Sequence, residues 1–379
     1  MFFKQGANAK QQPRKAYPGK YLALMGLAPE RIPHWEHWSD PDAETHLAGI
    51  DYYEHPRLCR QRLAELYPEL DLPVPATDDP KPRPTLGLEG NSSMTDAEGR
   101  HHIRWGDGES NIWDWGLKFD SAEDVFKFSP LAHGDFRNIP VVESQDYRDE
   151  EALYVKYRAE WPAEWGGRAP EGSPAMAGFY NTMFMWPLLT FGWDLFLQTC
   201  LDPRFERIMD EFAEINRRVF RVFARLPVNF VCCHDDIVTS RGPTCSPAWM
   251  HKYIFPRYEE FWDIVKSAGK EVIFMVDGRI DAYADDVFAC GARGIITEPY
   301  TDFKTIARKH KDCFLAGEGD NRILLRNDDA EIKAMVLNMV ETARMTGGYM
   351  MCIGNHIPWN VPGEAVKRYI EYSRRYARR

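Results

Sequence analysis

The sequence predicts an α/β fold in which helices cover a parallel β-sheet. Three observations lead to this prediction. From about residue 200 onward, amphipathic helical segments alternate with short apolar segments, and each short apolar segment is followed at once by polar residues. The chain also has 379 residues, 44% of them hydrophobic, which is enough to bury a large core. Parallel strands need long crossovers between them, and the helical segments supply these.

The regular part of the chain begins with a long helix that we expect to start at Asp202 and Pro203. Asp is a favourable N-cap, Pro fits the first turn, and apolar residues then recur at three- and four-residue steps as far as Leu226. Pro227 ends this helix. The expected strands that follow are 228–233, 271–276, 294–297, 313–316 and 349–353, and the expected helices are 246–269 (kinked or divided at Pro256), 280–289, 302–310, 328–346 and 362–375.

The first half of the chain is less regular. The Pro-rich stretch at 72–84 is typical of an extended connector. We expect residues 1–84 to form an N-terminal helical elaboration that ends in this connector, and residues 85–379 to form the catalytic domain. The candidate elements of this half are a helix at 51–66 and strands at 86–89 and 177–180.

Composition and charge disfavour several classes of protein. The formal net charge is −10, and the one basic run is the short tail from Arg374 to Arg379, so nucleic acid is not an expected partner. No apolar stretch approaches the roughly 20 residues of a membrane span, and the N-terminus lacks the apolar region of a signal peptide. The eight cysteines form no C-x-x-C pair. We therefore expect a cytoplasmic protein with reduced thiols.

Polar residues at the strand ends indicate where a site lies. No strand is followed by G-x-G-x-x-G and no P-loop is present, which disfavours nucleotide binding. Periodicity alone does not separate a barrel from an open sheet. In a (β/α)8 barrel, however, all strand ends converge on one mouth, and a series of polar strand ends favours a site there, although a single acid is more often a helix cap. The polar residues in this series are Asp236, Asp277, Glu298, Glu318 and His356.

Several segments carry a family resemblance over roughly residues 110–375. They are 114–117 (DWGL) followed by 121–125 (SAEDV) and 128–131 (FSPL), 189–196 (LTFGWDLF), 234–236 (HDD) with Ser246-Pro247 ten residues on, 317–320 (GEGD), and Ile357-Pro358 with Pro362 and Glu364. In order and spacing they resemble the uroporphyrinogen decarboxylase-like superfamily, especially its corrinoid-dependent methyltransferase branch. The resemblance implies a (β/α)8 TIM barrel with its site at the carboxyl ends of the strands.

The chain departs from one motif of that branch. The methylcobalamin:coenzyme M methyltransferases hold zinc with a His-x-Cys pair at one strand end and a Cys near the last strand. Here the first position reads Met275-Val276-Asp277, and the second falls at about Asn355, beside His356. Without thiolate ligands, a thiol-activating zinc site and a thiol acceptor such as coenzyme M are disfavoured.

The resemblance then implies the first methyltransferase of an O-demethylase system. Such an enzyme moves a methyl group from a small methylated donor, here expected to be an aryl methyl ether, to the Co(I) of a corrinoid protein. The cobalamin is expected on that partner because this chain has no D-x-H-x-x-G segment. A homodimeric state is left open.

Two alternatives remain. Uroporphyrinogen decarboxylases carry an Arg-rich N-terminal segment, whereas residues 33–38 read PHWEHW, so porphyrinogen decarboxylation is the second interpretation. The other alternative is that the chain is a non-catalytic partner of a corrinoid protein. Only the loss of the zinc motif supports this interpretation.

The candidate site residues follow from these arguments. An acid with a raised pKa can protonate the departing oxygen, and Asp277 is preferred because it replaces a ligand position of the relatives. The other catalytic candidates are Asp236, Glu298, Glu318 and His356. If zinc or another divalent ion is bound, the candidate ligands are His234, Asp236, Asp277, Glu298 and His356. The substrate-binding candidates are His34, Trp35, Trp38, Tyr180, Trp186 and Phe191.

Overall fold

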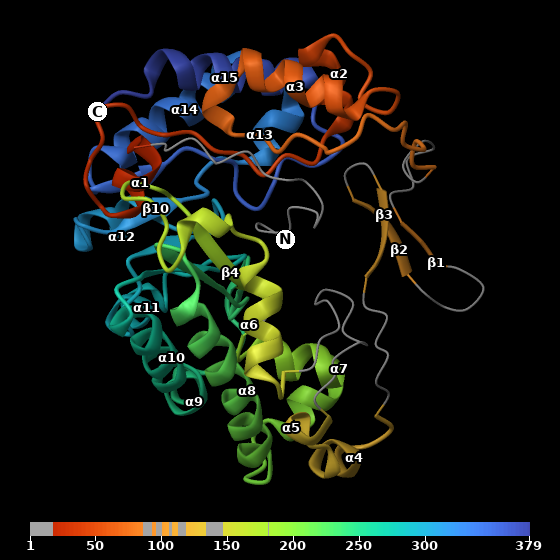
Figure 1. Cartoon of the computed structure of the whole chain (residues 1–379), viewed down its shortest axis with the longest axis vertical. Helices are drawn as coiled ribbons and strands as arrows, with labels where there is room; N and C mark the ends of the chain where they lie inside the picture. Colours follow the sequence, from red (N-terminus) through yellow and green to blue (C-terminus); the bar gives the residue numbers. More distant parts are fainter. Residues whose placement is uncertain are drawn as a thin grey trace.

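A computed structural model describes residues 18–85, 93–95, 101–105, 108–112, 119–133, 147–180 and 182–379 (Figure 1). The fold is an α/β TIM barrel, as the sequence predicts. Its central sheet holds six parallel strands in the order β11, β10, β9, β8, β5, β4. These strands are β4 (Met176–Tyr180), β5 (Phe230–His234), β8 (Glu271–Met275), β9 (Gly294–Ile296), β10 (Phe314–Ala316) and β11 (Gly348–Met350). The candidate strand at 86–89 and the segment 114–117 lie outside the described residues.

The N-terminal segment around His34 extends this sheet beyond β11. His34 forms a parallel bridge with Met351, the N–H of Trp35 donates to the Met351 carbonyl at 3.0 Å, and the N–H of Met351 donates to the Pro33 carbonyl at 2.8 Å. A part of the predicted N-terminal elaboration therefore contributes to the barrel wall beside the last strand.

Apolar side chains fill the inside of the barrel, because alternate residues of each strand point inward. The inward set includes Phe230 and Cys232 of β5 and Ile273 and Met275 of β8. Helix α1 (Pro18–Leu24) lies at the amino ends of β10 and β11 and adds its own apolar residues to this set. Its backbone comes so close to Gly348 that a Cβ at this position would collide with the Ala23 carbonyl. The amino end of the barrel is therefore tightly packed.

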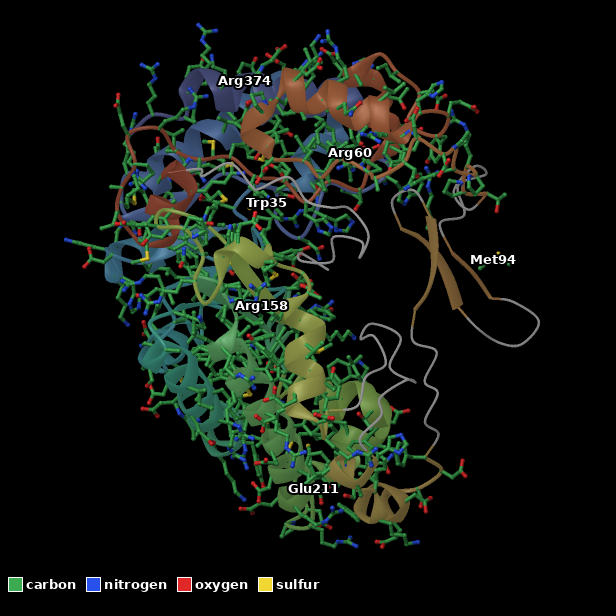
Figure 2. The ribbon with its side chains drawn as sticks, in the orientation of Figure 1. Trp35, Arg60, Met94, Arg158, Glu211 and Arg374 are labelled. Atoms are coloured by element: carbon green, nitrogen blue, oxygen red, sulfur yellow. The ribbon has the colours of Figure 1, made fainter. Side chains whose placement is uncertain are left out.

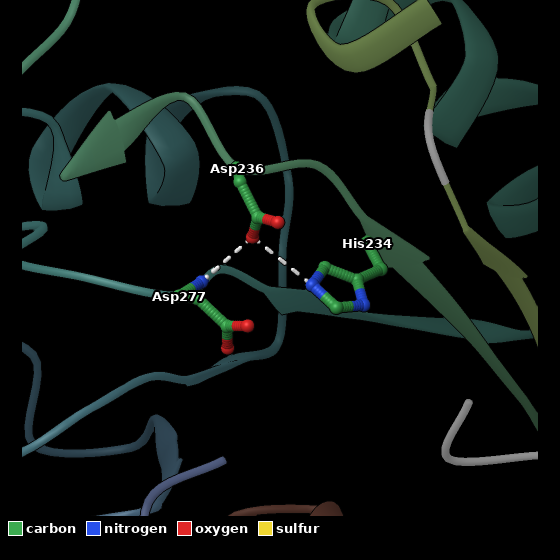
Figure 3. A group of neighbouring side chains, drawn as sticks. All are labelled: His234, Asp236 and Asp277. Carbon is green, nitrogen blue, oxygen red and sulfur yellow. Dashed lines mark hydrogen bonds and ion pairs between the residues drawn. The ribbon is translucent and has the colours of Figure 1, made fainter. Parts of the chain in front are cut away.

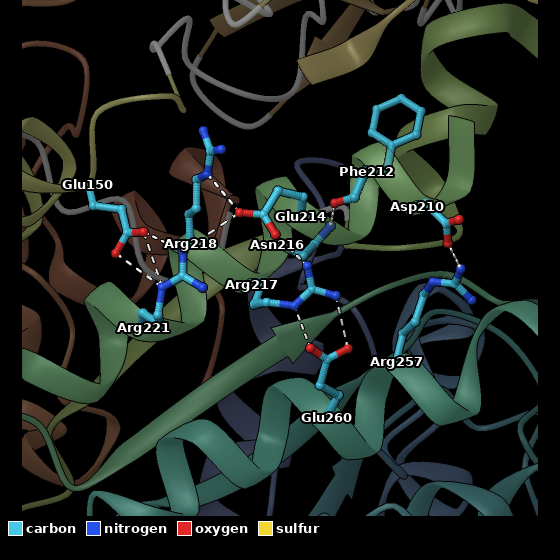
Figure 4. A network of polar contacts seen from close by, with 10 residues as sticks. All are labelled: Glu150, Asp210, Phe212, Glu214, Asn216, Arg217, Arg218, Arg221, Arg257 and Glu260. Carbon is cyan, nitrogen blue, oxygen red and sulfur yellow. Dashed lines mark hydrogen bonds and ion pairs between the residues drawn. The ribbon is translucent and has the colours of Figure 1, made fainter. Parts of the chain in front are cut away.

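Helices cover the outside of the sheet, and ion pairs join several of them. Arg217 of α8 pairs with Glu260 of α10, and Arg221 of α8 pairs with Glu150 of α6 (Figure 4). The helices after α1 are α2 (Pro41–Ala48), α3 (Pro56–Leu66), α4 (Ala122–Lys127), α5 (Pro130–His133), α6 (Glu150–Arg158), α7 (Met185–Thr199), α8 (Phe205–Arg225), α9 (Pro247–Tyr253), α10 (Phe255–Ser267), α11 (Ala284–Ala289), α12 (Phe303–Lys309), α13 (Asn321–Arg326), α14 (Asp329–Ala343) and α15 (Gly363–Tyr376), with short 3-10 turns η1 (Pro68–Leu70) and η2 (Ala163–Trp165).

Helices α2 and α3 pack with α14 and α15 in one layer, which is seen at the top of Figure 1. Arg60 of α3 forms a buried bidentate ion pair with Glu44 of α2, and Arg374 of α15 pairs with Glu69 of η1. Figure 2 labels Arg60 and Arg374 in this layer. The first pair joins two N-terminal helices to each other, and the second ties the N-terminal segment to the C-terminal helix. None of the helices among the described residues is long and apolar enough to cross a membrane.

Two small antiparallel sheets complete the fold. β1 (Ser93–Thr95), β2 (His101–Trp105) and β3 (Gly108–Ile112) form one, and β6 (Val238–Thr239) and β7 (Gly242–Pro243) form the other. Arg104 anchors the first sheet: its Nη2 donates to the Tyr53 hydroxyl at 3.3 Å, and its guanidinium lies 4.2 Å from the centre of the Trp359 ring.

The predicted elements after residue 200 agree with the structure within a few residues, with three corrections there and a fourth at the earlier helix 51–66. Helix α8 begins at Phe205, because Asp202 instead accepts the N–H of Arg204 at 2.9 Å within a turn. The predicted helix at 51–66 begins only at Pro56, since a turn precedes it and Pro fits a first helical position. Helix α13, which was not predicted, starts at its N-cap Asp320, and the predicted helix at 280–289 is reduced to α11.

Candidate active site

The ends of two neighbouring strands bring His234, Asp236 and Asp277 together. His234 is the last residue of β5 and pairs in register with Met275, the last residue of β8, so the residues that follow the two strands also lie side by side. Oδ1 of Asp236 accepts Nε2–H of His234 at 3.0 Å and the backbone N–H of Asp277 at 2.8 Å (Figure 3). One ligand atom of each residue lies within 4.8 Å of those of the other two. We call these three residues the acid–histidine cluster.

Burial and like charges change the acidity of this cluster. Burial, together with the neighbouring carboxylates of Asp236 and Glu298, raises the pKa of Asp277 to about 7, although His234 acts in the opposite direction. Burial also raises the pKa of Glu298, which receives a hydrogen bond from the backbone of Gly278. Glu298 therefore lies near the cluster, as predicted from its strand end. Asp277 is a carboxyl group that holds its proton close to neutral pH.

Tyr180 lies directly beside the cluster. It is the last residue of β4, pairs in register with His234, and presents its ring to the imidazole edge-on with 4.3 Å between the ring centres. Burial and the carboxylates of Asp236 and Asp277 raise the pKa of its phenol, so the hydroxyl stays protonated and can donate a hydrogen bond.

Asn355 connects the cluster to His356. Its Nδ2 donates to Oδ2 of Asp277 at 3.0 Å, and its Oδ1 is 2.6 Å from Nδ1 of His356. The His356 ring lies 5.6 Å from the ring of His37, and burial lowers the pKa of His356 to about 4 and that of His37 to about 3. Both imidazoles are therefore neutral. Sequence reasoning named Asn355 only as the place of a missing cysteine and did not select His37, although its place among the selected residues of PHWEHW (33–38) was a signal.

Glu318 lies apart from the cluster. Its Oε1 accepts hydrogen bonds from Asn338 at 2.8 Å and Thr342 at 2.9 Å, both on α14, and its Oε2 accepts the Tyr349 hydroxyl at 2.6 Å. A residue after a strand can face either side of the sheet, and Glu318 faces the helical layer. The structure therefore does not bring Glu318 together with the other acids.

The aromatic candidates other than Tyr180 have different surroundings. Trp35 is half-buried against the interior set and stacks on His37 with 6.5 Å between ring centres. His34 is buried and donates to Glu36 at 2.7 Å. The remaining three, Trp38, Trp186 and Phe191, belong to the large core between sheet and helices.

Asp235 supports the cluster from the opposite face of the sheet. Its carboxylate accepts the N–H groups of Met183, Phe184 and Met185 at 2.7–2.8 Å and the hydroxyl of Tyr258 at 2.7 Å. It thereby fixes residues 183–185 at the start of α7. Sequence reasoning did not select Asp235, although its place between two cluster residues was a signal.

The cluster has the donor set of a site for a divalent cation. One imidazole nitrogen and two carboxylate oxygens are hard or borderline ligands, and all three residues converge on one point. Such a set fits zinc or manganese, and it leaves coordination positions for substrate. His356 and Glu298 lie outside this set of three.

Comparisons with known proteins give a match to one family and to a solved structure of similar fold. A sequence model of the family described as uroporphyrinogen decarboxylase (URO-D) matches residues 201–376, which include the whole acid–histidine cluster, and it supports the resemblance at the level of the superfamily. A methyltransferase from Methanosarcina mazei has a similar structure, with a TM-score of 0.51 and 14% identity over 95% of this chain and 98% of that chain. Xylanase B from Clostridium stercorarium F9 gives a TM-score of 0.33 at 10% identity, over 62% of this chain and 86% of that chain. A comparison with curated proteins finds no match.

Proposed function

We propose that this protein is a methyltransferase that moves a methyl group from an aryl methyl ether to the Co(I) of a separate corrinoid protein. The observation that carries the proposal is the carboxyl group of Asp277, which is buried beside Asp236 at the strand ends of the barrel. The family match and the methyltransferase fold of the Methanosarcina mazei protein support methyl transfer as the class of reaction.

The chemistry requires an acid more than a nucleophile. Co(I) of the corrinoid supplies the electron pair of the new methyl–cobalt bond, so the enzyme has to align the methyl carbon and stabilise the leaving oxygen. The C–O bond breaks with its electron pair on oxygen, and the proton of Asp277 passes to that oxygen. The products are the methylated Co(III) corrinoid, a phenol and the Asp277 carboxylate. Tyr180, beside His234, is placed to donate a hydrogen bond to the donor molecule.

A divalent cation is the second way to activate the same oxygen. His234, Asp236 and Asp277 would hold the ion, which would supply Lewis acidity toward the ether oxygen. Elemental analysis of active enzyme separates the two versions. A stoichiometric ion supports the metal version, and activity that persists without one leaves Asp277 as the acid.

The description of the matching family favours one other candidate, the decarboxylation of a porphyrinogen. The segment at 33–38 reads PHWEHW and lacks the arginines that would pair with propionates. This candidate becomes the leading one if methyl transfer fails.

An anaerobic absorbance assay tests the proposal. Purified protein is mixed with a reduced corrinoid protein and, in turn, with methoxybenzenes, methylamines and methanol. We expect loss of the Co(I) band and growth of the methyl-Co(III) band with methoxybenzenes. Asp277→Asn should abolish this change, whereas Glu318→Gln, which alters an acid outside the cluster, should keep it. If no donor reacts even with the native corrinoid partner, methyl transfer from these compounds is excluded.

A further inference from the structure

Asn355 contacts three groups of the candidate site at once. Its side chain donates to Asp277 through Nδ2 at 3.0 Å and meets Nδ1 of His356 through Oδ1 at 2.6 Å. Its backbone carbonyl accepts a hydrogen bond from the ring of His37. Asn355 is thus the point where the acid of β8 meets two histidines that come from the N-terminal segment and the loop after β11.

The backbone of Asn355 is held in an uncommon conformation. Its φ is 63°, in the left-handed region that favours glycine and that Asn adopts more easily than most residues. Such conformations persist where the surroundings fix them, and they gather at functional sites. At Asn355, the three hydrogen bonds hold the residue in this left-handed conformation.

The hydrogen bonds of Asn355 set the direction of its amide. The amide nitrogen donates to Oδ2 of Asp277, which turns the amide oxygen toward Nδ1 of His356. An amide oxygen only accepts, so Nδ1 of His356 must carry the ring proton. Since a neutral imidazole holds a single ring proton, Nε2 of His356 is then left with a lone pair.

We infer that Asn355 is a positioning residue of this site, which fixes His356 in the Nδ1–H tautomer and holds that ring and Asp277 in one arrangement. Its Nε2 can then accept a hydrogen bond from a substrate or from a neighbouring group. The inference on the tautomer stands on the contacts alone, and its consequence for turnover rests on the proposed methyl transfer.

The tautomer can be measured without any assay of activity. Long-range 1H–15N correlation spectra of protein labelled with 15N-histidine distinguish Nδ1–H from Nε2–H rings, and His356→Gln assigns the signal. We expect the Nδ1–H tautomer in the unmodified protein and its loss in Asn355→Gly. An Nε2–H ring in the unmodified protein, or an unchanged ring in Asn355→Gly, would overturn the inference.

Asn327 offers a matched control. It is also an asparagine with positive φ, 54°, but it lies at the end of α13 and its partner is Arg368. Glycine adopts both conformations without strain, so Asn327→Gly and Asn355→Gly make the same backbone change at two places. Only Asn355→Gly should alter the His356 signal.

The kinetic test uses the same two variants in the methyl-transfer assay. We expect Asn355→Gly to lower kcat about 10- to 100-fold with KM nearly unchanged, as for other residues that orient a reacting group, and Asn327→Gly to leave kcat unchanged. A loss of kcat that only accompanies a lower Tm would indicate a structural role and overturn the positioning role. If the unmodified protein transfers no methyl group, the proposed function fails, while the tautomer measurement still decides the role of Asn355.

Discussion

Asp235 and Asp236 are adjacent in the sequence, yet their carboxylates lie on opposite faces of the sheet. Asp236 faces the interior, where it binds His234 and the backbone of Asp277, and Asp235 faces the helical layer, where it is fully buried. The alternation of side chains beyond β5 separates a residue of the site from one that supports the fold.

This separation predicts that Asp235→Asn mainly lowers stability, whereas Asp236→Asn mainly lowers activity. The carboxylate of Asp235 accepts four hydrogen bonds. In Asp235→Asn, the new NH2 group would face N–H donors and could not accept from them. This substitution should therefore lower the free energy of unfolding by about 3 kcal/mol. Asp236→Asn should change stability much less and should reduce methyl transfer. Urea unfolding and the absorbance assay measure the two effects, and equal losses of stability would contradict this division.

The acid–histidine cluster should bind a divalent cation. An ion that binds only the folded protein stabilises it, by about 2.7 kcal/mol at a free concentration 100 times the Kd. We therefore expect Zn²⁺ or Mn²⁺ to raise the Tm of the unmodified protein and not that of His234→Ala or Asp277→Ala. Glu318→Gln is the control, because Glu318 binds Tyr349 and residues of α14, away from the cluster. Equal shifts in all variants would indicate binding elsewhere.

Asp40 should make stability depend on pH. It is the N-cap of α2, accepts the N–H of Ala43 at 2.9 Å, and is fully buried. Burial, together with the nearby acids Glu44 and Asp42, raises its pKa to about 8. The folded protein therefore binds this proton more tightly than the unfolded chain, in which the pKa is about 3.9. The contribution to stability is complete below pH about 4 and is lost as the pH rises to about 8.

Asp40→Asn should remove this dependence, since Asn keeps the N-cap and carries no charge. The variant should match the unmodified protein near pH 4 and be more stable at pH 8, by at most about 5 kcal/mol at 1.36 kcal/mol per unit of pKa. Thermal unfolding across this range is the measurement. Asp42→Asn, which removes one neighbouring charge at a side chain that is 58% exposed, serves as the control and should keep the pH dependence, with its upper limit shifted to slightly lower pH. A variant that is less stable than the parent at pH 8 would contradict the assignment.

The regular periodicity of the second half explains why its elements could be predicted. In α8, apolar residues at three- and four-residue steps all fall on the buried face, and the short apolar strands end where polar residues begin. The same pattern could place Asp236 and Asp277 at one mouth because their strands are neighbours. It could not place Glu318, because the direction of a side chain after a strand depends on the turn, here at Gly317 with φ 100°.

The role of Asn355 could not be predicted from the sequence for a related reason. Its position in the site depends on a loop conformation with positive φ and on contacts with the ring of His37, more than 300 residues earlier in the chain. The bridge between the segment at His34 and Met351 brings these distant residues together. No local pattern in the sequence specifies such a pairing.

Tyr180 and Trp186 were both predicted to bind substrate, and the structure separates their expected effects. Trp186 is fully buried, and its ring lies 5.1–5.8 Å from those of Tyr147, Phe179 and Phe212. Trp186→Ala should therefore cost about 3–5 kcal/mol of stability through the lost core packing.

Tyr180→Phe removes one hydroxyl and keeps the ring that packs against His234, so it should leave the Tm nearly unchanged. It should reduce methyl transfer, because the donor that faces the cluster is lost. Urea unfolding of both variants and the absorbance assay of Tyr180→Phe are the measurements. If Trp186→Ala is stable but binds the methyl donor more weakly, Trp186 belongs to the substrate pocket. If Tyr180→Phe keeps full activity, its hydroxyl takes no part in the mechanism.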